Sequence, residues 1–296
     1  MDVGLIVPQG WTGEYKGFDP QSAWNRTVAI AQLAEASGFE SIWLFDHFHT
    51  EPDPTDEMTF ESFTSLSALA ARTSRVRLGH AVTCNGFRRP SLTAKMISTM
   101  DVISGGRMEL GIGAGWKEEE WLAYGYSFPS THDRISALAD ALEVITRMLA
   151  PGRASYEGQF ANVAGAINLP KGLQSPRIPL IVGGNGPNRT WRLAAQFADE
   201  LNLDGLSPRD VADALPVIRA RCEEIGRNPT TLRVSVHIWW EDATQPGDRR
   251  VELLGAYRDL GVSRVLTLIR DSATDDEPVH LFAADAVAAG AVMAIA

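Results

Sequence analysis

The sequence contains little cysteine, no block of basic residues and no long apolar stretch. The two cysteines, Cys84 and Cys222, give no sign of pairing, which disfavours a disulfide framework and fits a reducing compartment. With a formal net charge of −10 and no Lys/Arg run, the chain would repel nucleic acid. The N-terminus has no signal-peptide pattern, and no segment is apolar over the roughly 20 residues that cross a bilayer. We therefore expect a cytoplasmic protein with no nucleic-acid partner and no membrane partner.

Short, β-branched apolar runs alternate with amphipathic helical patterns from one end of the chain to the other. The candidate strands are residues 3–7, 41–45, 76–82, 107–112, 179–182, 200–203, 233–239 and 264–269. The helical patterns between them cover residues 22–37, 62–73, 91–103, 133–149, 187–197, 208–225, 247–260 and 278–289. Such alternation is typical of a parallel sheet, and eight repeats favour an α/β fold closed into a (β/α)8 TIM barrel.

The alternation is interrupted once, at residues 151–174. This segment contains turn residues and short alternating runs but no helical pattern. We expect an inserted loop or hairpin there, before the fifth strand. No internal repeat, low-complexity tract or linker indicates a second domain, so residues 1–296 are expected to form one domain.

The second strand ends in three titratable residues, Asp46, His47 and His49. In a parallel barrel the loops after the strands face one mouth, where the chemistry of such folds is found. Asp46 and His47 could orient a redox cofactor and its substrate, with the carboxylate fixing the tautomer of the imidazole. His47 and His49 could instead be two ligands of a metal ion. In a purely structural role, Asp46 would cap a turn while the histidines pack.

The ends of the third and fourth strands are also unusual. The third runs into residues 82–85 and a Gly-Phe turn, which requires a bulge or bend that would expose backbone groups to a ligand. The fourth ends in alternating glycines, Gly111, Gly113 and Gly115, where a flat ring or a phosphate could approach the backbone closely. Close packing of strand against helix would explain the same glycines.

The fifth strand is followed by a glycine-rich turn, GGNG at residues 183–186. Pro187 is then expected to open a helix at its favoured first position, with Arg189 in the first turn. Free N–H groups and the positive end of a helix dipole favour an anion there, so we expect phosphate binding rather than an ordinary turn.

Taken together, these segments resemble the luciferase-like monooxygenase superfamily, and more narrowly its coenzyme F420-dependent oxidoreductases. The matching stretches are residues 45–48, 73–95, 101–116, 132–145 and 181–199. The resemblance covers most of residues 1–205 and is specific in order and spacing. It implies a bacterial luciferase-like (β/α)8 barrel that holds a flavin or deazaflavin at its carboxyl mouth.

The resemblance also implies roles for individual residues. His47 would be the catalytic proton donor or acceptor beside the redox ring, and Asp46 would orient it. A non-prolyl cis peptide at Ala81–Val82 would support the ring from behind. The cofactor would be bound by Ala81, Val82, Thr83, Asn85, Gly113, Ala114, Gly115, Trp116, Gly183, Gly184, Asn185 and Gly186.

Three charged residues, Arg107, Asp133 and Arg134, are expected to hold the framework through buried or helix-end ion pairs, with Arg134 or His132 as further groups that could reach the cofactor. His80 stands where the family often has a small residue, and its imidazole could point into the barrel or toward the helices. Residues 198–205 replace the usual small-residue turn after strand six, which would alter one wall of the mouth. The substrate would be bounded by surface loops that include Trp11 and residues 50–60 and 151–174, so its identity stays open.

The function expected from the resemblance is hydride transfer between coenzyme F420 and a small organic substrate. An FMN-dependent luciferase-like monooxygenase is the alternative, because a deazaflavin gives up hydride only, whereas FMN can also activate oxygen. Two alternatives belong to other functional classes. One is a metal-dependent TIM-barrel hydrolase using His47 and His49, and the other is a barrel that binds a cofactor but catalyses no reaction. Because the glycine-rich strand ends indicate a flat, phosphorylated ligand, we expect no metal site. Most soluble oligomers are symmetric, which favours a homodimer.

Overall fold

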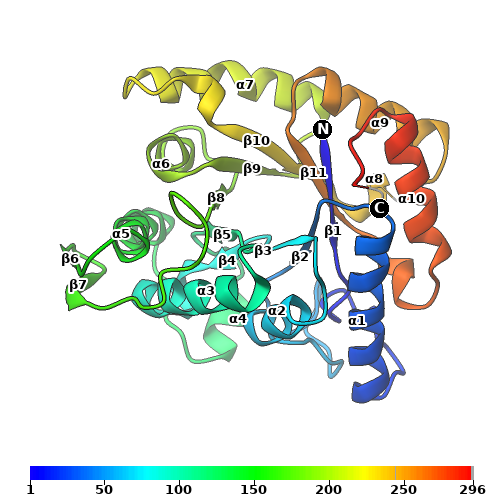
Figure 1. Cartoon of the computed structure of the whole chain (residues 1–296), viewed down its shortest axis with the longest axis horizontal. Helices are drawn as coiled ribbons and strands as arrows, with labels where there is room; N and C mark the ends of the chain where they lie inside the picture. The colour runs from blue at the N-terminus through cyan, green and yellow to red at the C-terminus, as the bar shows by residue number, and fades with distance from the viewer. Residues whose placement is uncertain (244, 295–296) are drawn as a thin grey trace.

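A computed structural model of the chain describes residues 1–243 and 245–294. Parallel strands encircle a central axis and helices cover them on the outside (Figure 1). The order of the strands in the nine-stranded sheet is β3-β2-β1-β11-β10-β9-β8-β5-β4. The TIM barrel expected from the alternation of patterns is therefore confirmed.

The strands of this sheet match the eight expected strands, with one of them divided in two. They are β1 (Asp2–Ile6), β2 (Ser41–Leu44), β3 (Arg77–His80), β4 (Thr83–Cys84), β5 (Leu110–Gly113), β8 (Leu180–Gly183), β9 (Glu200–Asp204), β10 (Arg233–His237) and β11 (Arg264–Leu268). The division falls at Ala81–Val82, whose peptide bond is cis, as the resemblance implied. Because β3 pairs with β2 and β4 pairs with β5, this single stretch of chain closes the barrel.

The helices follow the strands along the chain. They are α1 (Pro20–Ala36), α2 (Ser62–Ala70), α3 (Pro90–Ser104), α4 (Glu118–Ala123), α5 (Thr131–Leu149), α6 (Thr190–Phe197), α7 (Pro208–Glu223), α8 (Trp240–Ala243), α9 (Asp248–Asp259) and α10 (Glu277–Ala288). Prolines open α3 and α7 at the first position, where the missing N–H costs nothing. The short helices α4 and α8 were not expected from the sequence. None of the helices in the described part of the chain is long and apolar enough to span a membrane.

The insertion before the fifth barrel strand is a hairpin. Strands β6 (Ala154–Glu157) and β7 (Asn162–Ala166) pair antiparallel, and the hairpin lies on the outer side of α5 (Figure 1). The Tyr156 hydroxyl and the Phe160 N–H both donate to the carboxylate of Asp140 on α5. The segment therefore packs on a helix, and none of residues 151–174 lines the cavity at the carboxyl ends of the barrel strands.

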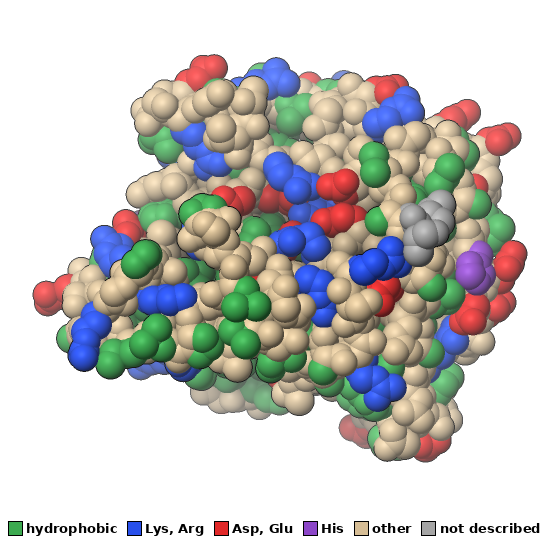
Figure 2. Space-filling model, in the orientation of Figure 1, with side chains coloured by type: hydrophobic (Ala, Val, Ile, Leu, Met, Phe, Trp, Pro, Cys, Tyr) green, Lys and Arg blue, Asp and Glu red, His purple; other side chains and the backbone are tan. Residues whose placement is uncertain are grey.

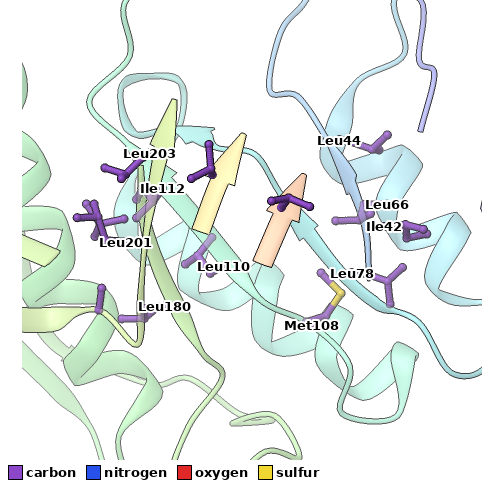
Figure 3. Packing of buried hydrophobic residues seen from close by; sticks show 14 of the residues in the cluster. Ile42, Leu44, Leu66, Leu78, Met108, Leu110, Ile112, Leu180, Leu201 and Leu203 are labelled. Atoms are coloured by element: carbon purple, nitrogen blue, oxygen red, sulfur yellow. The ribbon is translucent and has the colours of Figure 1, made fainter. Parts of the chain in front are cut away.

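Alternate residues of each strand divide the interior into two layers. In β2, Ile42 and Leu44 face the helices, whereas Trp43 faces the barrel axis. The outer layer continues from strand to strand (Figure 3). Each fully buried leucine or isoleucine there contributes about 1.5–3 kcal/mol relative to an exposed position.

The layer inside the barrel is built around the Trp43 indole. A Cβ added at Gly79 would lie 2.2 Å from the indole, and one at Gly4 would lie 2.6 Å from its nitrogen. These strand positions therefore require glycine for packing. The Trp43 N–H donates to the Ser41 hydroxyl at 2.8 Å.

A buried ion cluster lies at the amino ends of the strands. Arg264 donates to Glu109 and Glu200 at 2.9 Å each. Burial alone would lower the pKa of the Arg264 guanidinium, but the surrounding carboxylates raise it. Figure 2 shows basic and acidic side chains side by side in the hollow near the centre of the face it presents. Charged groups thus line the amino end of the barrel.

His80, whose direction the sequence left open, points toward the helices. Its imidazole is fully buried and stacks on the Phe63 ring of α2 at 4.1 Å between centroids. Burial lowers the pKa of His80 to about 4, and the nearby Asp46 carboxylate opposes this only in part. The residue is therefore a neutral element of the outer core.

This burial predicts a pH-dependent loss of stability. The unfolded chain binds a proton at His80 near pH 6.5, whereas the folded protein binds it only near pH 4, so stability falls as the pH drops through this window. The expected loss amounts to about 3 kcal/mol. Denaturant unfolding of the wild type and of His80→Phe should show a shallower pH dependence for the variant between pH 6.5 and 4. Parallel curves for the two proteins would contradict this account.

Candidate active site

A cavity of about 760 Å³ lies at the carboxyl ends of the strands. This size is typical of sites for small molecules and cofactors. Nearly all the expected site residues line it: Asp46, His47, Ala81, Val82, Thr83, Gly113, Ala114, Gly115, Trp116, Gly183, Gly184 and Asn185. Asn85, in the short helix η1 (Asn85–Phe87), and Gly186 do not line it. The strand ends therefore converge as expected, and the roles assigned to these residues remain predictions.

His47 stands on one wall of the cavity between two tryptophans. Its imidazole stacks on Trp11 with centroids 4.5 Å apart and planes 8° from parallel, and it meets Trp116 edge to face. Its Nδ1 lies 2.8 Å from a carboxylate oxygen of Glu120, so Nδ1 carries the proton of this hydrogen bond. The other nitrogen, Nε2, is thereby left as the basic nitrogen of the neutral ring.

Glu120 is the residue that orients His47, and it was not expected from the sequence. Its side chain is fully buried at the inner side of α4, and its second oxygen accepts the Phe48 N–H at 2.6 Å. Burial would raise the pKa of this carboxyl, but the hydrogen bonds from His47 and from the Phe48 N–H hold it below the ordinary value. Glu120 is therefore a carboxylate that keeps one tautomer of His47. Among the consecutive acids at 118–120, no feature of the sequence distinguished the buried one.

Asp46 has a different role from the expected one. Its buried carboxylate accepts two hydrogen bonds from the Arg88 guanidinium, one from the Ser62 hydroxyl and one from the Cys84 N–H. It thus joins the end of β2 to α2 and β4. The expectation that Asp46 orients the His47 ring is wrong, because its oxygens are bonded to these groups instead.

The cis peptide Ala81–Val82 forms the floor of the cavity, and glycines surround Val82. A Cβ added at Gly113 or Gly183 would lie 2.9 Å from the Val82 methyl groups. At Gly111 an added Cβ would lie 1.9 Å from the His80 carbonyl oxygen. Strand packing therefore explains these glycines. Because they have no side chains, nothing protrudes from the floor of the cavity at these positions.

The loop after β8 differs from the expected helix start. Residues 187–189 form a turn, and α6 begins at Thr190, so Pro187 is not the first residue of a helix. Arg189 donates to the His132 carbonyl and the Ser136 hydroxyl on α5, away from the expected anion. The Asn185 side chain bonds the backbone N–H and carbonyl of Asp204. Of this loop, Gly183, Gly184, Asn185 and Thr190 line the cavity.

Arg107 and Arg134 support the framework through backbone carbonyls, and neither forms the expected ion pair with a described carboxylate. Arg107 donates to backbone carbonyls of Ala70, Thr73, Val76 and Ser104. Arg134 donates to the Gly115 carbonyl and also lines the cavity. His132 is exposed, with Nδ1 3.4 Å from its neighbour Asp133.

His47 and His49 have separate partners. The Nδ1 of His49 lies 3.1 Å from the Thr50 carbonyl oxygen, whereas that of His47 faces Glu120. Among residues 1–243 and 245–294, no three histidine, cysteine or acidic side chains gather in a way that could hold a metal ion. Nothing in this geometry favours the hydrolase alternative.

The cavity suits a flat cofactor with polar edges. Its floor at Ala81–Val82 is apolar, and beside it the Thr83 hydroxyl is buried with no hydrogen-bond partner among the described residues. Buried hydroxyls are normally bonded, so this oxygen is suited to a polar edge of a bound ring. The fit is consistent with a flavin or deazaflavin.

A family model described as luciferase-like monooxygenase matches residues 1–245. An uncharacterised protein of Mycobacterium tuberculosis is 29% identical over 271 residues, which are 86% of this chain and 90% of the relative. The 5,10-methylenetetrahydromethanopterin reductase of Archaeoglobus fulgidus is 31% identical over 213 residues, 71% of this chain and 58% of that enzyme. The matched part of this chain thus spans little more than half of the reductase.

Solved structures show the same fold. An F420-dependent secondary alcohol dehydrogenase, in complex with an F420–acetone adduct, superposes with a TM-score of 0.81 at 17% identity, covering 97% of this chain and 98% of that one. A monooxygenase from Streptomyces bottropensis gives a TM-score of 0.74 at 21% identity, covering 97% and 99%. With the family model matching most of its length, the chain belongs to the luciferase-like monooxygenase family.

Proposed function

We propose that the protein is an oxidoreductase that transfers a hydride between coenzyme F420 and a small organic substrate. The observation that carries this proposal is the His47–Glu120 pair, which presents a basic imidazole nitrogen in the same cavity as the Ala81–Val82 floor. The F420-dependent dehydrogenase of the same fold supports the choice of cofactor. A deazaflavin bound there would supply or accept the hydride.

The protein's own residues would then handle the proton. His47 would give a proton to, or take one from, the substrate at Nε2, while Glu120 stabilises the imidazolium through Nδ1. Trp11 and Trp116 contact the His47 ring and hold it in place. Ala81, Val82 and Thr83 would hold the cofactor ring. Gly183, Gly184 and the start of α6 would receive its phosphate.

FMN is the second candidate cofactor. The monooxygenase of the same fold supports it, and the apolar floor with its polar edge at Thr83 would accept either ring. The two candidates differ in chemistry, since a reduced flavin is reoxidised by oxygen and a reduced deazaflavin is not.

Thr83 provides a test of where the cofactor binds. Replacing it with valine keeps the shape and removes the buried hydroxyl, so the Kd for F420 should rise about three- to tenfold. Thr267→Val is the matched control, because the Thr267 hydroxyl is also buried without a partner but does not line the cavity. Fluorescence titration with F420, and in parallel with FMN, gives both constants. Equal Kd values for the two variants would argue against cofactor binding at the Ala81–Val82 floor beside Thr83.

The His47–Glu120 pair provides a test of the chemistry. His47→Asn should lower kcat about 10²- to 10⁴-fold in reactions of F420 with small alcohols and ketones, the range for loss of a general acid or base. Glu120→Gln should lower kcat less and displace the pH profile, since the imidazolium loses its charged partner. Glu119→Gln removes the same charge from the exposed side of α4 and should leave kcat unchanged. If His47→Asn turned over at the wild-type rate, His47 would not be the proton-transfer group.

A further inference from the structure

We propose that Asp204 and His237 form a second imidazole–carboxylate pair in this cavity, one that binds a hydroxyl or N–H group of the substrate. This inference rests on the proposed function, because it concerns the substrate side of the same site. The pair lies at the ends of β9 and β10, while His47 follows β2. Asp204 belongs to the segment 198–205, in which the sequence departs from the usual pattern.

The two residues are held in register by the sheet. Asp204 and His237 face each other across the β9–β10 ladder, and the Nδ1 of His237 lies 2.9 Å from the Asp204 carboxylate. Both backbone groups of Asp204 are bonded to the Asn185 side chain. The Gly205 N–H donates to the His237 carbonyl at 2.9 Å. The pair is therefore a fixed part of the cavity wall.

One nitrogen of the His237 imidazole, Nε2, has no hydrogen-bond partner among the described residues. Because an ionised carboxylate can only accept, Nδ1 carries the proton and Nε2 is the acceptor of the neutral ring. His237 is 4% exposed and lines the cavity, and its Nε2 is buried with no hydrogen-bond partner among the described residues. A buried acceptor in this position is satisfied by a ligand that donates a hydrogen bond.

The surroundings of His237 are aromatic. Its ring lies 4.7 Å from Trp239 and 5.5 Å from Phe45, centroid to centroid. Trp11 contacts Phe45 and Trp239, and it also stacks on His47. The two histidines therefore lie along one continuous apolar wall.

This arrangement defines a class of substrate. The wall favours an apolar or aromatic body, and Nε2 of His237 requires a donor group on it, away from the atom that reacts near His47. The Asp204 carboxylate beside His237 disfavours an anionic group at this end. The geometry thus points to a neutral aromatic or cyclic compound with a hydroxyl or N–H substituent.

Benzyl alcohol, toluene and benzoate provide the test, because they share one ring and differ in the substituent. Isothermal titration of the wild type should give a Kd about tenfold lower for benzyl alcohol than for toluene, with benzoate weaker than benzyl alcohol. His237→Phe keeps an aromatic ring and removes the acceptor. This variant should bind benzyl alcohol and toluene with Kd values within about twofold of each other.

Nitrogen-15 spectra of histidine-labelled wild type give a second measurement that needs no variant. Benzyl alcohol should move the Nε2 resonance of His237, whereas toluene should not, and exposed His280 on α10 serves as the reference. An unmoved Nε2 resonance, or an undiminished preference for benzyl alcohol in His237→Phe, would overturn the inference. Titration of the same wild-type sample with F420 tests the proposed function separately, since these ligands are measured without a cofactor.

Discussion

The candidate site depends on one buried ion pair, between Asp46 and Arg88. The Asp46 carboxylate accepts hydrogen bonds from the guanidinium at 2.7 and 3.0 Å and also from the Cys84 N–H, so it ties the end of β2 to β4. His47 follows Asp46 directly, and Val82 directly precedes β4. One interaction therefore sets the position of the imidazole and of the cavity floor relative to each other. Removing a partner from such a buried pair typically costs about 3–5 kcal/mol, which makes this arrangement hard to alter by substitution.

Glycines and imidazole–carboxylate pairs have separate roles around this ion pair. Glycines at 113 and 183 let the barrel close tightly on Val82 and leave the floor without protruding side chains. Two imidazoles line the cavity, each with Nδ1 on a carboxylate: His47 on the buried Glu120 and His237 on the half-exposed Asp204. The same imidazole–carboxylate arrangement thus occurs on two walls of the cavity. We assign proton transfer to His47 and substrate recognition to His237.

Much of this could be predicted from the sequence. The eight-fold alternation determines the barrel, and the carboxyl ends of parallel strands must converge, which brought His47, Val82 and Gly183 to one mouth. Partnerships between side chains could not be predicted. Asp46 stands beside His47 in the sequence, yet its carboxylate is bonded elsewhere, while Glu120 approaches from a short helix that has no periodic signal. Local patterns report which element a residue occupies, whereas the partner of a buried polar group is decided by tertiary packing.

A crystal structure of the protein with coenzyme F420 would test the central claim most directly. We expect the deazaflavin ring to lie against Ala81–Val82, with one polar edge at the Thr83 hydroxyl and the His47 imidazole beside the face that exchanges hydride. The phosphate should lie near Gly184 and the start of α6. Density for the ring elsewhere in the cavity, with His47 out of contact, would contradict the account.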